Sequence, residues 1–224
     1  MPDSIPSFDP SASVTLLGAA PCGTGIVSIA LTRAHRLVAV DGGADVARRA
    51  GWTPERVVGD LDSLSDDARA AFADRTDHVA EQDSTDLEKA LRTTEAPLLL
   101  GAGFLGGRFD HGLAALSALA GDPRPVVLLS ADDCLCIAPP ALEIDVAAGT
   151  RVSLWPLGDA TGRSAGLHWP LDGLTLRPTG PVGTSNRATG PVRLRLAGGP
   201  VALILPLEAL DALLDALALA GARG

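Results

Sequence analysis

The sequence of 224 residues contains little cysteine. Its three cysteines, Cys22, Cys134 and Cys136, are too few and too unevenly spaced for a disulfide framework, which favours a reducing compartment. If Cys134 and Cys136 belong to a strand, both thiols lie on one face of it, because side chains alternate along a strand.

Positive charge is also scarce, with a formal net charge of −9 and a pI of about 4.8. A nucleic-acid backbone needs a concentrated lysine and arginine surface, so this balance argues against nucleic acid as a partner. Of the 18 basic residues only Lys89 is a lysine. A preference for arginine codons explains the arginine excess, whereas a site that requires a compact ammonium would explain the exception.

A basic leader and a long apolar run are both lacking. Residues 1–13 carry acidic residues and proline instead, so we expect neither a signal peptide nor a membrane span, and we expect a cytoplasmic protein. With 46% hydrophobic and 20% charged residues, the composition is typical of a chain that is folded throughout.

Short apolar runs alternate with helical patterns from residue 14 to about residue 137. This alternation predicts an α/β fold, with a Rossmann-like parallel sheet covered by helices over residues 1–139. Thr85 followed by Glu88 predicts a capping box at a helix start. The expected strands are Val14–Leu17, Leu37–Val40, Arg56–Val58, His78–Ala80, Pro97–Leu100 and Val126–Leu129, and the expected helices are Ile26–Ala34, Ala44–Ala50, Asp66–Ala73, Leu87–Leu91 and Gly112–Ala120.

The pattern changes after Pro139 and Pro140 to short runs separated by glycine and proline. Residues 140–224 are therefore predicted to form a smaller antiparallel β-sandwich domain that ends in a helix over Leu207–Ala220. We interpret this helix as a packing helix, with a dimer contact as the alternative. The expected strands are Arg151–Trp155, Leu174–Leu176, Val192–Leu196 and Val201–Leu205.

Aspartates follow several of the predicted parallel strands, where ligands bind in open α/β sheets. The segments are Asp41-Gly-Gly-Ala-Asp45, Gly59-Asp-Leu-Asp-Ser63, Gln82-Asp-Ser-Thr-Asp-Leu-Glu-Lys89 and Gly106-Gly-Arg-Phe-Asp-His111. Each acid alone is consistent with a cap or a turn. The run Gly18–Gly25 is equally consistent with a phosphate cradle and a plain turn.

Several carboxylates in one crevice repel one another unless a hard cation neutralises them, and oxygen ligands favour magnesium. Magnesium usually binds together with substrate phosphates. Lys89 and Arg108, which are close in sequence to these acids, would supply positive charge for phosphoryl oxygens. The pattern therefore indicates phosphoryl-group transfer.

Taken in order, these segments resemble the motifs of the thiamine pyrophosphokinases. Gly166-Leu-His-Trp-Pro-Leu171 and Gly183-Thr-Ser-Asn186 resemble that family's thiamine-binding β domain, so the resemblance spans about residues 14–205. It implies a magnesium-dependent homodimer that transfers the pyrophosphoryl group of ATP to the hydroxyl of thiamine and releases AMP.

The resemblance also implies roles for individual residues. It assigns Asp60, Asp62 and Asp86 to magnesium and catalysis, together with Arg108 as a catalytic residue. In the nucleotide site it implies Asp41, Gly42, Gln82, Thr85, Lys89, Asp110 and His111. Whether Asp110 contacts nucleotide or thiamine stays open, and so does the identity of any carboxylate that removes the hydroxyl proton.

For thiamine the resemblance implies Ser185 and Asn186, in a pocket shared between two subunits. Trp169 offers an aromatic face to a cationic ring, although a core tryptophan is an equal alternative. The sequence departs from the family pattern at Asp45 and Ala115, where asparagine is common, and at Leu61, where phenylalanine is usual.

Two other functions compete with this interpretation. An Asp-x-Asp after a parallel strand also binds metal and sugar nucleotide in glycosyltransferases, but that function explains neither Gly106–His111 nor Gly183–Asn186. A sensor of thiamine or nucleotide that has lost catalysis is the other alternative, and turnover measurements distinguish it.

Overall fold

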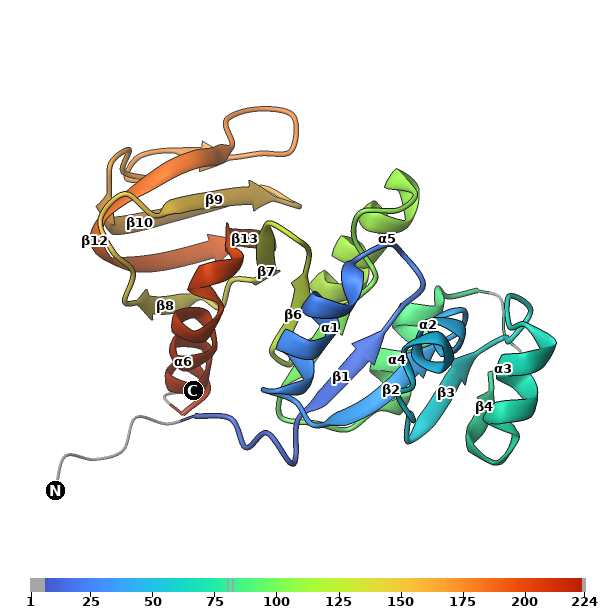
Figure 1. Cartoon of the computed structure of the whole chain (residues 1–224). Coiled ribbons are helices and arrows are strands. Elements are labelled where there is room, and N and C mark those ends of the chain that lie inside the picture. The colour runs from blue at the N-terminus through green and yellow to red at the C-terminus, as the bar shows by residue number, and fades with distance from the viewer. Residues whose placement is uncertain (1–6, 80, 82, 223–224) are drawn as a thin grey trace, which may run out of the picture. The chain divides into compact units, whose positions relative to one another are not determined.

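The computed structural model describes residues 7–79, 81 and 83–222. The chain forms two compact units, Asp9–Ala131 and residues 132 onward, and the second also includes residues 7 and 8. The predicted α/β fold class is confirmed (Figure 1). The units divide after Ala131, whereas the sequence-based domain boundary falls after residue 139.

The first unit is built on a parallel sheet with the strand order β6-β5-β1-β2-β3-β4. Its strands are β1 (Val14–Leu17), β2 (Arg36–Val40), β3 (Arg56–Gly59), β4 (Thr76–His78), β5 (Leu99–Ala102) and β6 (Val126–Leu129). Every residue of β1, β5 and β6 is buried. Such continuous apolar strands are typical of a parallel sheet that is covered on both faces.

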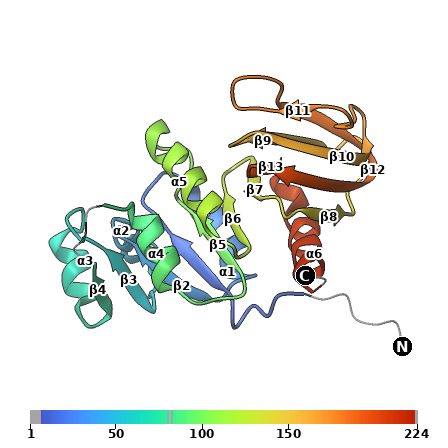
Figure 2. The same ribbon diagram turned by 180° about the vertical axis from the view of Figure 1, so that it is seen from behind.

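Helices supply that cover, with α1 on one face of the sheet and α4 and α5 on the other (Figures 1 and 2). The helices are α1 (Gly23–Leu31), α2 (Gly43–Ala50), α3 (Asp66–Ala71), the 3₁₀ turn η1 (Ala73–Arg75), α4 (Asp86–Thr93) and α5 (Phe109–Gly121). The predicted capping box is confirmed at α4, where Thr85 and Glu88 bond reciprocally. The start of α2 packs closely against β1: a side-chain carbon on Gly43 would lie 1.8 Å from the Leu17 carbonyl oxygen, so only glycine fits there.

The second unit consists of antiparallel strands that share one long member, β12 (Gly183–Gly198). The first part of β12 pairs with β9 (Arg151–Pro156), and its later part pairs with β10 (Ala160–Leu167) and β8 (Ala141–Ile144). The remaining strands are β7 (Asp133–Ile137), β11 (Thr175–Leu176) and β13 (Val201–Pro206), in the pairs β9-β13, β13-β7 and β10-β11.

The chain ends in the 3₁₀ turn η2 (Leu207–Ala209) and helix α6 (Leu210–Gly221), which contacts β8. The leucine stripe of α6 is buried, as expected for a packing helix. Cys134 and Cys136 are both buried in β7, in agreement with their predicted alternation. None of the helices in the described ranges is long and apolar enough to cross a membrane.

Candidate active site

A cavity of about 350 Å³ lies in the first unit at the carboxyl ends of β1, β2, β3 and β5. The strand order reverses between β1 and β5, which is where ligands bind in open parallel sheets. The cavity is lined by Gly18, Ala19, Ala20, Val40, Asp41, Gly42, Ser63, Thr85, Asp86, Leu87, Gly103, Phe104, His111, Ala114 and Ala115. Part of the Gly18–Gly25 run therefore faces the cavity.

Three carboxylates converge beside this cavity. One oxygen from each of Asp41, Asp60 and Asp86 lies within 4.8 Å of the others. Asp41 follows β2, Asp60 follows β3, and Asp86 is the first residue of α4. Because parallel strands end at one edge of the sheet, acids that are distant in sequence meet here.

Asp41 is the most constrained member of this cluster. Its backbone has φ of +45°, a region that asparagine and aspartate tolerate better than most residues. Burial raises the pKa of Asp41, and the neighbouring charges of Asp86 and Asp60 raise that pKa further. Its Oδ1 atom is buried and has no hydrogen-bond partner within the described part of the chain. An ionised carboxylate with such an oxygen lacks a positive partner.

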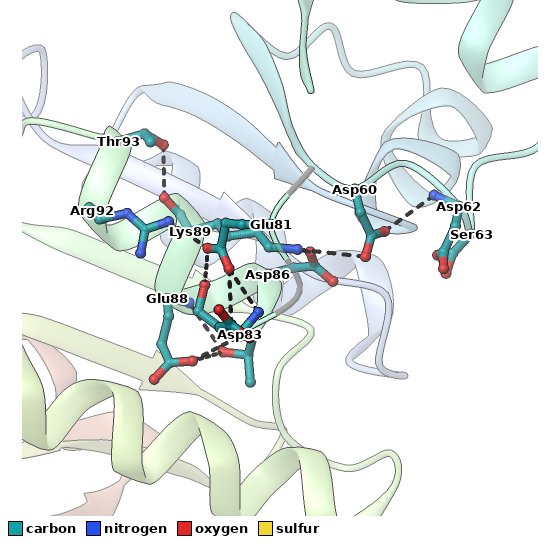
Figure 3. Close-up of polar contacts among 12 residues, drawn as sticks. Asp60, Asp62, Ser63, Glu81, Asp83, Asp86, Glu88, Lys89, Arg92 and Thr93 are labelled. Carbon is teal, nitrogen blue, oxygen red and sulfur yellow. Dashed lines mark hydrogen bonds and ion pairs between the residues drawn. The ribbon is translucent and has the colours of Figure 1, made fainter. Parts of the chain in front are cut away.

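Lys89 supplies positive charge to the other two acids (Figure 3). Its Nζ lies 3.0 Å from Asp86 Oδ1 and 3.6 Å from Asp60 Oδ2, and its side chain is only 2% exposed. Burial by itself lowers the pKa of an ammonium, but the hydrogen bond to Asp86 and the charges of Asp86 and Asp60 outweigh it and leave the pKa of Lys89 raised. The single lysine of the chain is therefore a buried counter-ion.

The loop after β3 holds Asp60 in place through the backbone of Asp62. The Asp62 backbone N–H donates to Asp60 Oδ1 at 3.3 Å, and this hydrogen bond is the main cause of a lowered pKa at Asp60. Leu61 between them has φ of +67°, an unfavourable conformation for a leucine. The Asp62 carboxylate accepts from Ser63 Oγ at 3.1 Å and is exposed. The described cluster thus contains Asp41 rather than Asp62.

This donor set fits a hard divalent cation. The three groups offer only carboxylate oxygens, which magnesium prefers, and the unpartnered Asp41 Oδ1 has capacity for a cation. Lys89 provides one positive charge for three carboxylates, so the cluster retains an uncompensated negative charge.

Three helix starts face the same cavity and favour an anion beside the cluster. Gly42 precedes α2, Thr85 and Asp86 begin α4, and His111 lies in the first turn of α5. Helix N-termini present unpaired backbone N–H groups and the positive end of the helix dipole. The site therefore combines ligands for a cation with donors for phosphate oxygens.

Other residues predicted for this site are placed differently. Arg108 is exposed and forms an ion pair of 2.6 Å with Asp110, and neither side chain lines the cavity. Thr85 lines it, although its hydroxyl is used in the capping box with Glu88. Gln82 lies outside the described residues.

Glu81 organises the entrance to α4. Its carboxylate accepts hydrogen bonds from the Asp83 N–H, the Ser84 N–H and hydroxyl, and the Arg92 guanidinium. The Ser84 hydroxyl and Arg92 lower the pKa of Glu81 to about 2. The segment that delivers Asp86 is thus fastened by an ionised Glu81.

A pH dependence follows from the lowered pKa of Glu81. The stability that ionised Glu81 adds to the folded state is complete above the unfolded pKa of about 4.5. It is lost as the pH falls from there toward about 2. We expect amide exchange at Asp83 and Ser84 to gain an acid-dependent opening component between pH 5 and pH 3. In Glu81→Gln this component should be pH-independent, and identical profiles in both proteins would contradict the assignment.

In the second unit, Asn186 is buried and uses its whole side chain to hold another segment. Its amide N–H donates to the Trp169 carbonyl at 2.7 Å, and its Oδ1 accepts from the Trp169 N–H at 3.1 Å and from the Arg187 N–H at 2.8 Å. Trp169 itself is 56% exposed and packs edge-on against His168. The exposed indole argues against the alternative that Trp169 is a core residue. The hydrogen bonds from Asn186 hold the Trp169 backbone in place.

Ser185 precedes Asn186 in β12 and has a strained backbone conformation. Its φ is +59°, and its backbone N–H donates to the Ser153 hydroxyl at 2.9 Å, which leaves its own exposed hydroxyl available. Of the residues predicted for thiamine, Ser185 and Trp169 therefore present ligand-accessible groups, whereas Asn186 has a supporting position.

Replacing Asn186 with leucine is expected to lower the free energy of unfolding by about 1–2 kcal/mol, because backbone groups lose their partners. Thermal unfolding measures the effect, and Trp169 should become more accessible to a fluorescence quencher. Thr184→Ala, an exposed change two positions away, is the matched control. Equal stability of both variants would show that the hydrogen bonds of the Asn186 side chain do not contribute to the free energy of unfolding.

The structure adds residues that the sequence did not indicate. Ser63 and Phe104 line the cavity; Ser63 ends one of the aspartate segments but had no predicted role, and Phe104 lies outside those segments. Asp45 does not line it but accepts from the Ser65 N–H at 3.0 Å, at the start of α3. The departure at Asp45 is therefore accommodated structurally, whereas Ala115 forms part of the cavity wall.

The fold and the site define a class: α/β proteins with an acidic site at the switch point of a parallel sheet. Within that class, residues 28–125 match the family profile described as thiamin pyrophosphokinase, catalytic domain. Thiamine pyrophosphokinase 1 of Arabidopsis thaliana is 30% identical over 162 residues, which cover 63% of this chain and 61% of the relative. Thiamin pyrophosphokinase 1 of Caenorhabditis elegans is 26% identical over 178 residues, covering 70% and 73%.

Solved structures show the same fold over most of the chain. Thiamin pyrophosphokinase from Candida albicans aligns with a TM-score of 0.74 at 16% identity, covering 92% of this chain and 94% of that one. The enzyme from Geobacillus thermodenitrificans aligns with a TM-score of 0.70 at 24% identity, covering 86% and 96%. The sequence similarity to the thiamin pyrophosphokinase catalytic domain thus covers residues 28–125, and the structural similarity extends over most of the chain. It spans about three fifths of the length of the plant relatives that it matches.

Proposed function

We propose that this protein is a thiamine diphosphokinase. It transfers the pyrophosphoryl group of ATP to the hydroxyl of thiamine and produces thiamine diphosphate and AMP. The observation that carries the proposal is the convergence of Asp41, Asp60 and Asp86 within 4.8 Å, at helix starts that favour phosphate. The similarity to thiamine pyrophosphokinases supplies the substrates of the proposal.

In this proposal the acid cluster holds magnesium against the phosphates of ATP. Asp60, Asp86 and Asp41 would be its protein ligands, and Asp62 stays a predicted ligand. Bound magnesium neutralises phosphate charge and stabilises the charge that develops during transfer. Lys89 keeps Asp60 and Asp86 at their positions, and the backbone N–H groups at the starts of α2, α4 and α5 receive phosphate oxygens.

The transfer joins the thiamine hydroxyl oxygen to the β-phosphorus and breaks the bond between that phosphorus and the oxygen that bridges it to the α-phosphorus. The hydroxyl proton passes to a carboxylate or to water, and the bridging oxygen leaves as part of AMP. Alignment of the two substrates contributes most of the rate, because phosphoryl transfer depends on positioning and charge stabilisation. Arg108 stays a predicted contributor of positive charge, which would require it to leave Asp110.

We assign thiamine to the second unit, with the exposed Trp169 indole as the surface for its rings and Ser185 as a hydrogen-bonding group. Asn186 positions Trp169. The two units are then a catalytic domain and a thiamine-binding β-sandwich domain. We further propose that the protein acts in the cytoplasm as a homodimer with shared active sites, as the family resemblance implies.

A product assay tests the proposed function. Purified protein is incubated with thiamine, ATP and magnesium, and AMP is separated from ADP, and thiamine diphosphate from the monophosphate. Equal amounts of AMP and thiamine diphosphate are expected, with no product from Asp86→Asn. ADP with thiamine monophosphate would contradict pyrophosphoryl transfer, and a folded protein without turnover would favour the sensor.

A further inference from the structure

A second and larger cavity lies wholly within the second unit, apart from the residues proposed for thiamine. Its volume is about 770 Å³, within the range of small-molecule sites. The walls come from β8, β10, β12 and α6, which Figure 2 shows in one unit. Neither Trp169, Ser185 nor Asn186 belongs to its lining.

Two arginines lie opposite each other in this cavity. Arg163 of β10 and Arg195 of β12 are direct cross-strand partners, so their side chains lie on the same face of the sheet. Both are exposed, and within the described residues neither forms a hydrogen bond or an ion pair with a side chain. A third arginine, Arg193, lies two pairs further along the ladder and therefore on the same face.

The acids of the cavity are already engaged. Glu143, the cross-strand partner of Arg193, accepts from its Nε at 2.9 Å. Asp172 accepts from the Ser164 N–H at 3.2 Å. Arg163 and Arg195 therefore remain a pair of adjacent guanidinium groups, although the chain as a whole carries a net charge of −9.

Like charges directly opposite each other destabilise an antiparallel pair. A ligand with negative charge between the two guanidinium groups would reverse this effect, because each group can donate two parallel hydrogen bonds to a phosphate. The lining also includes Ala216, Leu219 and Ala220, which share one apolar stripe of α6. The cavity thus pairs a cationic end with an apolar surface.

We propose that this cavity binds a small organic phosphate, with its phosphate on Arg163 and Arg195 and its apolar body against α6. The site needs no divalent cation, unlike the acid cluster of the first unit. It also does not depend on the proposed enzymatic function, since none of its residues has a role in that function.

Calorimetry on the full-length protein in EDTA and low salt tests the proposal, with phenyl phosphate and inorganic phosphate as probes. Phenyl phosphate is expected to bind more tightly than inorganic phosphate, because only the ester reaches the α6 wall. Arg163→Ser and Arg195→Ser should each weaken phenyl phosphate binding at least about tenfold. Arg177→Ser, which removes an arginine already paired with Asp159, is the control for net charge.

Stability provides a second readout in the same variants. Without ligand, Arg195→Ser is expected to raise the melting temperature by about 1–3 °C at low salt, because it removes the like-charge pair. If serine there prevents folding, Arg195→Lys keeps the charge and should still weaken binding through loss of the bidentate geometry. Absence of phenyl phosphate binding, or equal binding by wild type, Arg163→Ser and Arg195→Ser, would overturn the proposal.

Discussion

Lys89→Met is expected to lower the free energy of unfolding by about 2–3 kcal/mol when no divalent cation is present. Methionine preserves most of the hydrocarbon packing, so the loss reports the ammonium. Without it, Asp60 and Asp86 lose the cation that, among the described residues, forms ion pairs with them. The expected loss is smaller than the loss typical of breaking a fully buried ion pair, because the side chains of Asp60 and Asp86 remain 22% and 32% exposed.

Chemical denaturation in EDTA and in magnesium measures this effect. Magnesium should stabilise Lys89→Met more than it stabilises the wild type, because the ion replaces the missing positive charge. Arg92→Met on the same helix is the matched control, since its ion pair with Glu81 is exposed to solvent and should contribute little to stability. Equal losses in the two variants would show that Lys89 is not the counter-ion of the cluster.

Asp41→Asn is expected to separate stability from activity. Asparagine has nearly the same shape and tolerates φ of +45°, but it removes a carboxylate whose burial is unfavourable. We expect the free energy of unfolding in EDTA to rise by about 1 kcal/mol at pH 7. Turnover should fall about 100-fold or more, equivalent to about 2.7 kcal/mol of transition-state stabilisation, through loss of a metal ligand.

The sign of the stability change depends on pH. Because the folded-state pKa of Asp41 is raised above its usual value of about 3.8, its ionisation costs stability only as the pH rises above that value. The advantage of Asp41→Asn should therefore disappear near pH 3. Asp45→Asn is the control with the opposite sign, because hydrogen bonds from Ser65 outweigh burial and lower the pKa of Asp45. A destabilised but fully active Asp41→Asn would contradict the assignment.

Periodicity predicted most of the first unit because its strands are apolar throughout and its helices have clear caps. β1 and β6 have the predicted bounds, whereas β4 and β5 are displaced by two residues at their starts. In the second unit the sequence did not indicate β7, β8 or β10. β10 contains small and polar residues and becomes a strand through its pairing with β12, an interaction that local propensity does not report.

The acidic character of the site was predictable because the aspartates follow consecutive parallel strands. The members of the cluster were not predictable, because the backbone conformation of the loops, such as the positive φ at Leu61, is not visible in the sequence pattern. The single lysine among the basic residues did indicate a residue of the site. The structure gives the physical reason, because the Lys89 ammonium is buried next to two carboxylates. Asn186 illustrates the limit, because a motif position does not reveal that its side-chain amide holds the backbone of Trp169.

Binding of Mn²⁺, followed by electron paramagnetic resonance in the presence of a non-hydrolysable ATP analogue, tests the central claim most directly. The wild type is expected to bind the ion, Asp41→Asn and Asp86→Asn to lose at least about tenfold in affinity, and Asp45→Asn to bind as the wild type does. Undiminished Mn²⁺ affinity in both Asp41→Asn and Asp86→Asn would contradict the account, because the carboxylate cluster would then not be the metal site.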